Sequence, residues 1–573
     1  MQPRWILARD DSLNGDGISW PDLCGSECIT RLLRRKSFSC VDDVRAFLNP
    51  RLASLGDPFQ LASMGETVER ILHAIDRKER VVLFGDYDVD GVTSLALLWQ
   101  TLRAYGCEAA LFLPHRIDEG YGLSADGVAR CLKQHQPQLL IAIDCGTTSL
   151  REIASLRQQS VDVIVLDHHE PSRSSGSGGE PKDELPDCLL VNPKASASSL
   201  TYLCSAGLTF KLCHALLKAR RIDFDLKAAL DLVALGTVAD IVPLRGDNRV
   251  FVKSGSNVLA QSRRLGVVKL MEAAGVKPPI MPEDIGFRLG PRLNAAGRLD
   301  TAEKALRLLL TENAIEAEQL ARELDAQNRE RQEVEKKILA EAEETLGESD
   351  AGNDAAIVLG ARGWHPGVLG IVASRVSKKY HRPAIIIGFD ETGAGKGSGR
   401  SIEGCSLVAA LRECGTVLEK FGGHEMAAGL ALREEKMPEF RERFVAAARA
   451  QLSEDALMPR LHLDAELTLR DVSFDLLHWH EMLQPFGNGN PQPVFVSCAV
   501  EPGSPPRLCG ERHLALKLKQ NNWHQRAIFF DSAAEPLPEP PWDVAFRVRS
   551  DVYEGETRIQ LQVQALRSVA PLD

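Results

Sequence analysis

Four short apolar runs, each followed by a polar cluster, constrain the fold of this chain more than any other feature. The runs are VVLF at 81–84, AALFL at 109–113, QLLIAI at 138–143 and DVIVL at 162–166. The residues between successive runs have the composition and spacing of helices. Continuous apolar strands that alternate with helices are typical of a parallel sheet covered on both faces. The sequence therefore predicts an α/β domain in this part of the chain.

The polar residues after these strands are mostly acids and histidines. DYDVDG follows the first run, DCGTT the third and DHHE the fourth. In an open parallel sheet, ligands bind in the crevice beyond the carboxyl ends of the strands. A domain that only had to fold would not need acids at that edge. We therefore expect a functional site there.

Five side chains suit a metal centre: Asp88, Asp90, Asp144 and His168 after these strands, and Asp240 after a later apolar run in LVALGTVADIVPL, 232–244. Carboxylates with an imidazole favour Mn²⁺ or Mg²⁺ over a metal that prefers thiolates. Two such ions about 4 Å apart can generate a hydroxide and hold the leaving oxygen of a phosphoryl group. A single DxD is often a solvated loop, and paired histidines often have a structural role. Their joint occurrence at one sheet edge favours the metal site.

The rest of the chain predicts further units. Residues 171–187 are a Ser-, Gly- and Pro-rich surface loop, and 205–275 are largely helical. Apolar residues at helical spacing among many charges predict a long helix up to 346. A second α/β unit begins at AAIVLGA, residues 355–361, and the texture becomes all-β from 460. That number of short strands indicates a small barrel, for which the oligonucleotide-binding (OB) fold is one candidate.

The formal net charge of −11 argues against a protein that coats nucleic acid over its whole surface. Any such contact must be local, and the segment from Arg362 to Arg400 is suitable, since it holds seven Lys or Arg against two acids. Apolar runs long enough to cross a bilayer and a signal peptide are both missing from the sequence. We expect a cytoplasmic protein.

The order of nine motifs resembles the DHH phosphoesterase superfamily and, within it, the bacterial 5′→3′ single-strand DNA exonucleases. The motifs are DYDVDG, RIDEGYG, DCGTT, DHHE, LGTVADIVPL, GPRLNAAGR, GWHPGVLGIVASR, GSGRS and FGGHEMAAG. The resemblance implies an N-terminal region packed on the DHH domain (1–75), the catalytic DHH domain (76–300) and a long connecting helix (301–346). A DHHA1 domain (347–455) and an OB-like domain (456–573) follow. It also implies a shorter form than relatives with an additional C-terminal domain.

The resemblance also implies roles for the site residues. Asp88, Asp90, Asp144, His168 and Asp240 would bind the two ions, with Asp144 as the bridge. His169 would contact the scissile phosphate or act as an acid on the leaving group. Asp144, His168 and His169 are thus the expected catalytic residues. Asp86 and Asp167 would lie behind the metal ligands, where Asp167 is suited to orient a histidine.

Gripping a 5′-phosphate requires groups outside the metal site, and the planar fork of arginine suits phosphate. The resemblance assigns this role to Arg116, Arg298, Ser398 and Arg400. His365 would lie beside the strand, and Tyr121 would stack on a base. The basic segment 362–400 would then line a channel too narrow for a duplex.

The implied function is single-strand-specific 5′→3′ hydrolysis that releases 5′-mononucleotides in recombinational repair, with two Mn²⁺ or Mg²⁺ ions. The implied partners are single-stranded DNA, a single-strand-binding protein and a RecQ-type helicase, and we expect a monomer without a membrane partner. One alternative is a phosphodiesterase for short oligonucleotides or cyclic dinucleotides. Others are a single-strand-binding replication factor without catalysis and a metabolic pyrophosphatase.

Overall fold

The computed structural model describes residues 3–8, 24–36, 38–114, 119, 122–174, 182–299, 301–347, 354–553 and 555–571. The chain forms two compact units. One contains Leu7–Asp325 together with Leu463–Pro571, and holds the predicted DHH and OB-like parts. The other contains Met1–Ile6, Ala326–His462 and Leu572–Asp573, and holds the second α/β part. Each unit is described by itself.

The larger unit contains the predicted parallel sheet, with strands in the order β3-β2-β4-β5-β8. The strands are β2 (Val81–Gly85), β3 (Ala110–Phe112), β4 (Leu139–Ile143), β5 (Asp162–Leu166) and β8 (Leu189–Val191). Every neighbouring pair is parallel. The prediction of a parallel-sheet α/β domain is therefore confirmed.

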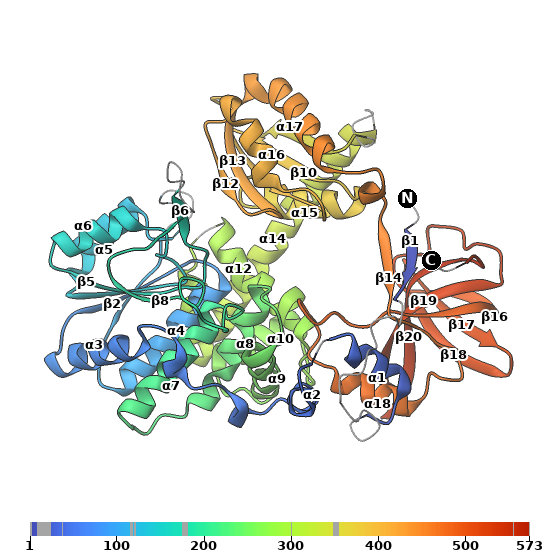
Figure 1. The fold of residues 1–573 in the computed structure, drawn as a ribbon, viewed down its shortest axis with the longest axis horizontal. Coiled ribbons are helices and arrows are strands. Elements are labelled where there is room, and N and C mark those ends of the chain that lie inside the picture. The colour runs from blue at the N-terminus through green and yellow to red at the C-terminus, as the bar shows by residue number, and fades with distance from the viewer. Residues whose placement is uncertain are drawn as a thin grey trace. The chain divides into compact units, whose positions relative to one another are not determined.

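Helices cover both faces of this sheet, because alternate strand residues point to opposite sides. Val81 and Leu83 of β2 join the core under α3, α4, α7 and α8, whereas Val82 and Phe84 join the core under α5 and α6. The two layers are visible in Figure 1. The helices are α3 (Met64–Arg77), α4 (Val89–Ala104), α5 (Ala125–His135), α6 (Leu150–Gln158), α7 (Ser205–Ala219) and α8 (Leu230–Ala239). The remaining helices here are α9 (Gly246–Ala260), α10 (Leu265–Ala274), α11 (Pro282–Asp284), a π-turn (Ile285–Leu289), α12 (Gly290–Leu299) and α13 (Glu303–Leu310).

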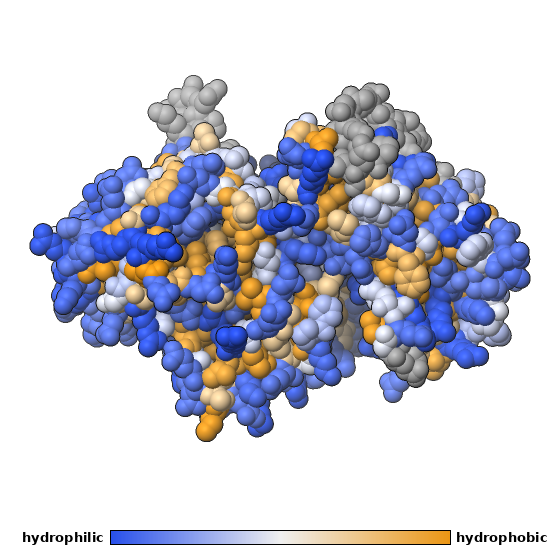
Figure 2. All heavy atoms as spheres, turned by 90° about the horizontal axis from the view of Figure 1, so that it is seen from below, coloured by the Kyte–Doolittle hydropathy of each residue, from blue (hydrophilic) through white to orange (hydrophobic). Residues whose placement is uncertain are grey.

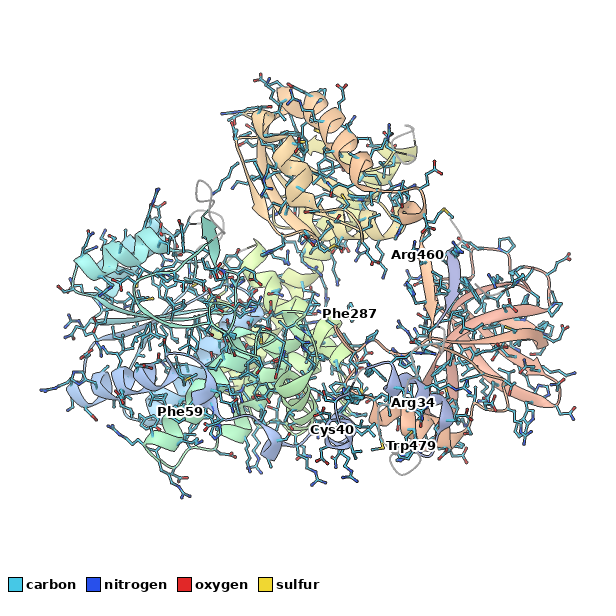
Figure 3. The ribbon with its side chains drawn as sticks, in the orientation of Figure 1. Arg34, Cys40, Phe59, Phe287, Arg460 and Trp479 are labelled. Atoms are coloured by element: carbon cyan, nitrogen blue, oxygen red, sulfur yellow. The ribbon has the colours of Figure 1, made fainter. Side chains whose placement is uncertain are left out.

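Within the predicted N-terminal region, 1–75, the first described helices pack on the C-terminal barrel and not on the DHH domain. Helices α1 (Glu27–Arg34) and α2 (Val41–Leu48) place Ile29, Leu33 and Val44 in the core of the C-terminal barrel. Trp479 belongs to helix α18 (Phe474–Met482) beside the barrel (Figure 3). A Cβ atom on Gly25 would lie 3.3 Å from its Nε1 atom, so the chain just before α1 is in close contact with α18. Only the later part, including α3, joins the DHH core. The physical reason is that the apolar faces of α1 and α2 are buried in the core of the barrel.

The smaller unit contains a mixed sheet in the order β12-β13-β11-β10-β9. Its strands are β9 (Ile357–Arg362), β10 (Ala384–Phe389), β11 (Ala394–Arg400), β12 (Lys420–Gly423) and β13 (Ala427–Arg433). Helices α14 (Ala314–Gly347) and α15 (Leu369–Tyr380) pack on one face, and α16 (Leu407–Glu413) and α17 (Met437–Gln451) on the other. The glycine-rich GAGKGSGRS is therefore mostly strand β11, and FGGHEMAAG is mostly the β12–β13 hairpin.

The long connecting helix is present, but it begins later in the chain than the predicted start at 301. The predicted stretch 301–346 divides into α13 and α14 (Ala314–Gly347). Between them, the side chain of Asn313 accepts hydrogen bonds from the amides of Ile315, at 2.9 Å, and Glu316, at 3.3 Å. An asparagine that caps the first amides of a helix competes with continuation of the preceding helix. That cap separates the two helices.

The C-terminal part is a closed five-stranded barrel. Its strands run in the order β16-β17-β18-β20-β19, and β16 also pairs with β19, which closes the circle. They are β16 (Phe495–Cys509), β17 (His513–Gln520), β18 (Trp523–Phe529), β19 (Trp542–Tyr553) and β20 (Glu556–Ser568). The short β15 (Ala465–Glu466) pairs in parallel with β16, and β1 (Arg4–Leu7) pairs with β14 (Arg460–Leu463). The predicted OB-like barrel is confirmed.

Polar residues predominate on the face drawn in Figure 2, and apolar ones are interspersed among them. Among the described helices, none combines the length and the apolar character needed to cross a bilayer. The predicted loop 171–187 carries a small ladder of β6 (Ser172–Ser174) and β7 (Lys182–Glu184).

Candidate metal centre

The predicted metal ligands gather where the strand order of the parallel sheet changes direction. The chain passes from β2 to β3 on one side and then returns to β4 on the other. Asp86 and Asp88 follow β2, Asp144 follows β4, and His168 follows β5. Such a switch point opens a crevice at the carboxyl ends of the strands. Asp240 joins the group from the end of α8.

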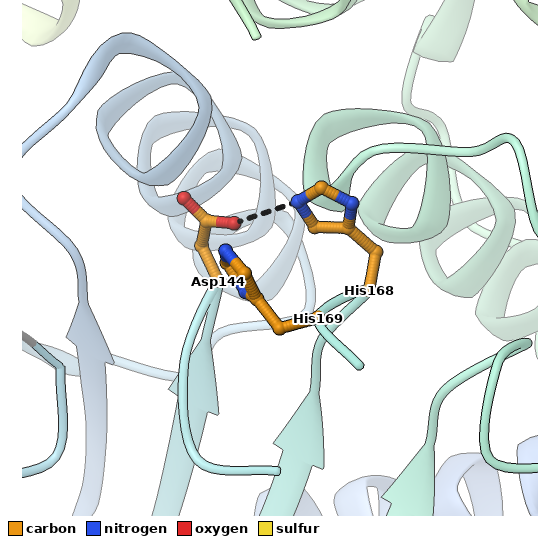
Figure 4. Close-up of side chains that lie close together, drawn as sticks. All are labelled: Asp144, His168 and His169. Atoms are coloured by element: carbon orange, nitrogen blue, oxygen red, sulfur yellow. Dashed lines mark ion pairs between the residues drawn. The ribbon is translucent and has the colours of Figure 1, made fainter. Parts of the chain in front are cut away.

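His168 lies at the centre of three carboxylates. Its Nε2 atom is 3.5 Å from Oδ1 of Asp144, as Figure 4 shows. The same nitrogen is 3.5 Å from Oδ2 of Asp240 and 3.8 Å from Oδ2 of Asp90. Three sets of side chains each place one ligand atom per residue within 4.8 Å of the others. They are Asp90–His168–Asp240, Asp86–Asp88–Asp144 and Asp144–His168–His169.

The N-terminus of α7 receives the Asp90 carboxylate. The amides of Ser205 and Ala206 donate to its two oxygens at 2.7 and 2.8 Å. The hydroxyl of Ser205 donates to Oδ1 of Asp144 at 2.8 Å. Helix N-termini stabilise negative charge, so α7 offsets part of the cost of burying these two acids. Ser205 also restrains the direction in which Asp144 presents its oxygens.

The turn between β2 and α4 requires glycine at position 91. A Cβ atom on Gly91 would lie 2.5 Å from the carbonyl oxygen of Asp86. Asp88 caps α4 by accepting from the amide of Gly91 at 3.1 Å. Asp144 lies in the left-handed region, with φ of 64°. Such a conformation is uncommon outside glycine, and retained strain of this kind clusters at functional sites.

The buried carboxylates repel one another in the absence of a cation. Burial, and then the charge of Asp88, raise the pKa of Asp90 to about 6. Burial and the neighbouring carboxylates raise the pKa values of Asp144 and Asp240 well above their usual range. Among the described residues, Nε2 of His168 and Oδ2 of Asp240 are buried without a hydrogen bond. Oxygen and imidazole ligands with excess negative charge fit divalent cations of the Mn²⁺ or Mg²⁺ class.

The two histidines have opposite electrostatic environments. Burial and the neighbouring His169 lower the pKa of His168 to about 3, which keeps its lone pair available. Burial alone would lower the pKa of His169, but its hydrogen bond with Asp167 raises it to about 9. Nδ1 of His169 lies 2.7 Å from Oδ1 of Asp167. Burial opposes the ionised form of Asp167, yet contacts with His169 and the amide of Thr147 hold its pKa below the usual range.

The predicted strand-binding residues are distributed among several parts of the chain. Arg116 and Tyr121 lie outside the described residues. Arg298 is partly buried in the last turn of α12, in the larger unit. In the smaller unit, Arg400 Nη1 donates to Ser398 Oγ at 3.3 Å, and both belong to β11. Nδ1 of His365 accepts from the amide of Gly367 at 3.1 Å.

Much of the basic segment 362–400 has structural partners. Arg362 donates to Glu434 at 2.7 Å, and Lys379 lies 2.7 Å from Glu343. Arg375 pairs with the buried Glu335. The guanidinium of Arg382 is buried and donates to backbone carbonyls of residues 354, 381 and 457. That the segment 362–400 lines a strand channel stays a prediction, and Lys378, Lys396 and Arg400 are the cations of the segment that these contacts do not use.

Several residues that hold the centre together escaped the sequence analysis. Besides Ser205, Asn192 donates to Thr147 Oγ1 and to the carbonyl of His169, both at 2.9 Å. Asn294 accepts from the amide of Val89 at 3.1 Å, which fixes the start of α4. Asn294 lies inside the motif GPRLNAAGR. The motif was therefore a signal for Asn294 alone. Asn192 and Ser205 lie outside the nine motifs, and their contacts join distant segments.

Three family descriptions match successive parts of the chain. The DHH family N-terminal domain matches residues 80–237, the DHHA1 domain matches 353–450, and the RecJ OB domain matches 463–565.

Curated relatives and solved structures agree with this order. The chain is 37% identical to the single-stranded-DNA-specific exonuclease RecJ of Bacillus subtilis over 87% of its own length, and spans 62% of that relative. It is 35% identical to the Thermus thermophilus protein of the same name, over 92% of this chain and 73% of that one. The crystal structure of RecJ from Thermus thermophilus with Mn²⁺ has a TM-score of 0.84 and 31% identity, and covers 100% of this chain and 80% of that chain. The Mg²⁺ complex has a TM-score of 0.78 at 30% identity, over 100% of this chain and 79% of that chain.

Proposed function

This chain belongs to the RecJ family of single-stranded-DNA-specific exonucleases, and from that premise we propose that it removes nucleotides from the 5′ end of single-stranded DNA. It is a metal-dependent exonuclease of the DHH phosphoesterase class. The observation that carries the proposal is the cluster around Nε2 of His168, with carboxylate oxygens of Asp90, Asp144 and Asp240 within 3.8 Å.

The residues that would hold two divalent ions are Asp88, Asp90, Asp144, His168 and Asp240. Asp86 is added by geometry, since it groups with Asp88 and Asp144. Asp144 and His168 each belong to two of the three sets, and of these two only the Asp144 carboxylate has two oxygens with which it could serve both ions. When bound, Mn²⁺ or Mg²⁺ supplies Lewis acidity toward a phosphoryl group and lowers the pKa of a bound water.

The protein's own groups position the substrate and move the proton. Asp167 holds Nδ1 of His169 by a 2.7 Å hydrogen bond, which directs the other ring nitrogen away from Asp167. A protonated His169 donates from that nitrogen to the scissile phosphate or to the leaving oxygen, as a general acid would. Ser205 and the α7 amides keep Asp90 and Asp144 in place throughout.

Recognition of the 5′ end falls to Arg116, Arg298, Ser398 and Arg400 in this proposal. The Arg400 side chain is partly buried, and this burial lowers the pKa of its guanidinium. A partly desolvated guanidinium binds phosphate bidentately and strongly. His365 and Tyr121 would contact the strand, and the closed barrel would bind it further from the end.

The proposed setting is recombinational repair in the cytoplasm, with the protein acting as a monomer. A single-strand-binding protein and a RecQ-type helicase would supply and protect the single strand. Family membership supports the repair setting and the single-stranded DNA substrate.

The deciding experiment is digestion of end-labelled DNA with Mn²⁺ or Mg²⁺. We expect early release of a 5′ label as mononucleotide from a single strand, and little release from a blunt duplex. Preferential turnover of a dinucleotide would instead support the short-oligonucleotide phosphodiesterase. Strand binding without nucleotide release would support a non-catalytic binding protein.

A further inference from the structure

A tight turn in the linker before the barrel reaches the metal centre. The linker carries QPFGNGN at 484–490, which none of the assigned roles uses. Gly487 and Asn490 exchange backbone hydrogen bonds of 2.9 and 3.1 Å, so Asn488 and Gly489 form the tip of the turn. Gly489 has φ of 71°, which suits the tip of a four-residue turn.

The base of this turn is firmly held. The side-chain amide of Asn490 donates to the carbonyls of Leu483 and Pro485 at 2.9 and 2.8 Å. Arg249, a buried residue of α9, donates to the carbonyls of residues 482–485 at distances from 2.7 to 3.3 Å. A single planar guanidinium thus links the catalytic domain to the linker of the barrel. The turn has little freedom to move away.

The tip of the turn forms hydrogen bonds with the loop that follows Asp240. The side-chain amide of Asn488 donates to the carbonyl of Ile241 at 2.6 Å. The amide of Leu244 donates to the carbonyl of Asn488 at 2.7 Å. A Cβ atom on Gly489 would lie 3.0 Å from Cβ of Pro243, so the two backbones are in close contact. The loop after Asp240 is therefore held at two points by one residue.

Ile241 needs such support because its backbone is strained. It has φ of 58°, and its side chain is 70% exposed. A β-branched residue rarely adopts the left-handed region, and it keeps this conformation only where its surroundings impose it. The strained peptide comes directly after Asp240, so a change at Ile241 would redirect the Asp240 carboxylate.

We propose that Asn488 is a positioning residue for Asp240, through which the barrel's linker completes the metal centre. The inference rests on the proposed function only in taking Asp240 as a metal ligand. Residues that orient a ligand commonly change metal affinity about 10–100-fold when they are replaced. The consequence is a physical connection between the strand-binding barrel and the catalytic ions.

The test is Mn²⁺ binding by the full chain, measured from free Mn²⁺ by electron paramagnetic resonance. We expect Asn488→Ala to weaken Mn²⁺ binding about 10-fold or more at one of the two sites. Its nuclease activity should recover as Mn²⁺ is raised. Asn488→Asp keeps the side-chain shape but cannot donate to the Ile241 carbonyl, and it should show the same defect. If Asn488→Ala does not fold, Asn488→Asp still tests the inference.

Asn522→Ala is the matched control, since Asn522 is an exposed asparagine in the turn between β17 and β18. It should bind Mn²⁺ like the wild type. Wild-type Mn²⁺ affinity in both Asn488 variants would overturn the inference, and so would an activity loss that added Mn²⁺ does not relieve. A wild-type chain that binds Mn²⁺ but leaves single-stranded DNA intact would refute the proposed function alone, because the Asn488 comparison needs no cleavage.

Discussion

The Nδ1 atom of His169 lies 2.7 Å from Oδ1 of Asp167, and the same oxygen accepts the backbone amides of His168 and His169. One carboxylate thus fixes both the ring and the backbone of the histidine pair. This arrangement gives the two neighbouring histidines different tasks. His168 keeps a free nitrogen for a metal, whereas His169 keeps a proton for the phosphate.

Asp167→Asn should lower nuclease activity about 10–100-fold while leaving Mn²⁺ affinity close to that of the wild type. The amide oxygen of asparagine still accepts the two backbone amides, but it lacks the charge that keeps His169 protonated. His169→Gln should cost about 10²–10⁴-fold, the usual range for a general acid. Single-turnover cleavage of labelled single-stranded DNA measures both changes.

The double variant tests whether Asp167 acts through His169. It should be no slower than His169→Gln alone, because the carboxylate has no ring left to orient. If the activity losses of the two single variants multiply in the double variant, Asp167 has a role that is independent of His169. His168→Ala, in contrast, should lose Mn²⁺ binding together with activity.

Asp144→Asn should abolish nuclease activity and, without metal, should raise the melting temperature by a few degrees. Burial and neighbouring acids raise the pKa of Asp144, so its ionised form destabilises the metal-free fold at neutral pH. Asparagine tolerates the φ of 64° at this position better than alanine does. Differential scanning calorimetry with and without Mn²⁺ is the measurement.

The Mn²⁺-dependent rise in melting temperature should disappear in Asp144→Asn, while binding of single-stranded DNA should persist. Full cleavage activity in this variant would falsify the assignment of the centre. The expected gain in metal-free stability also separates removal of a repelling charge from simple damage to the fold.

Local sequence patterns predicted the parallel sheet because its strands are buried on both faces. β2 and β4 are continuous apolar runs without an exposed residue. β8, at the sheet edge, has only three residues, so no pattern identified it. The break between α13 and α14 was readable in principle, since Thr311, Glu312 and Asn313 include a common capping residue.

Long-range contacts in the site could not be predicted in the same way. The Ser205 hydroxyl binds Asp144 across 61 positions, and Asn488 binds Ile241 across 247. Neither serine nor asparagine has a local signature for such a contact. Barrel closure likewise depends on pairs such as Val500 with Trp542, which only the assembled sheet brings together. The side-chain types indicated the chemistry, whereas their supporting contacts required the fold.

Arg400→Ala should reduce the preference for a 5′-phosphorylated end over a 5′-hydroxyl end about 10-fold or more, with a smaller effect on the maximal rate. Loss of a charge-assisted hydrogen bond to phosphate costs about 1.5–3 kcal/mol. Arg362→Ala is the control, because that exposed guanidinium is already paired with Glu434. Equal end preference in the wild type and Arg400→Ala would exclude Arg400 from end recognition.

His480 should make the barrel acid-sensitive. Burial and the charge of Arg549 lower its pKa to about 4, from an ordinary value of 6.5. Between those two values the unfolded chain binds the proton and the folded chain does not. The stability contribution is therefore complete above pH 6.5 and is lost as the pH falls toward 4, by on the order of 2 kcal/mol at pH 5.

Substitution by an apolar residue should remove this dependence. His480 packs against Phe486 and Phe495, and among the described residues neither of its ring nitrogens makes a hydrogen bond. Leucine in its place therefore keeps the contacts with the two rings and loses no hydrogen bond. The difference in free energy of unfolding between pH 7 and pH 5 should shrink by on the order of 2 kcal/mol in this variant. His478→Leu, a change in an exposed histidine on the same helix α18, provides the comparison. Urea titrations at both pH values decide the matter, and an unchanged pH dependence in His480→Leu would assign the acid sensitivity to other groups.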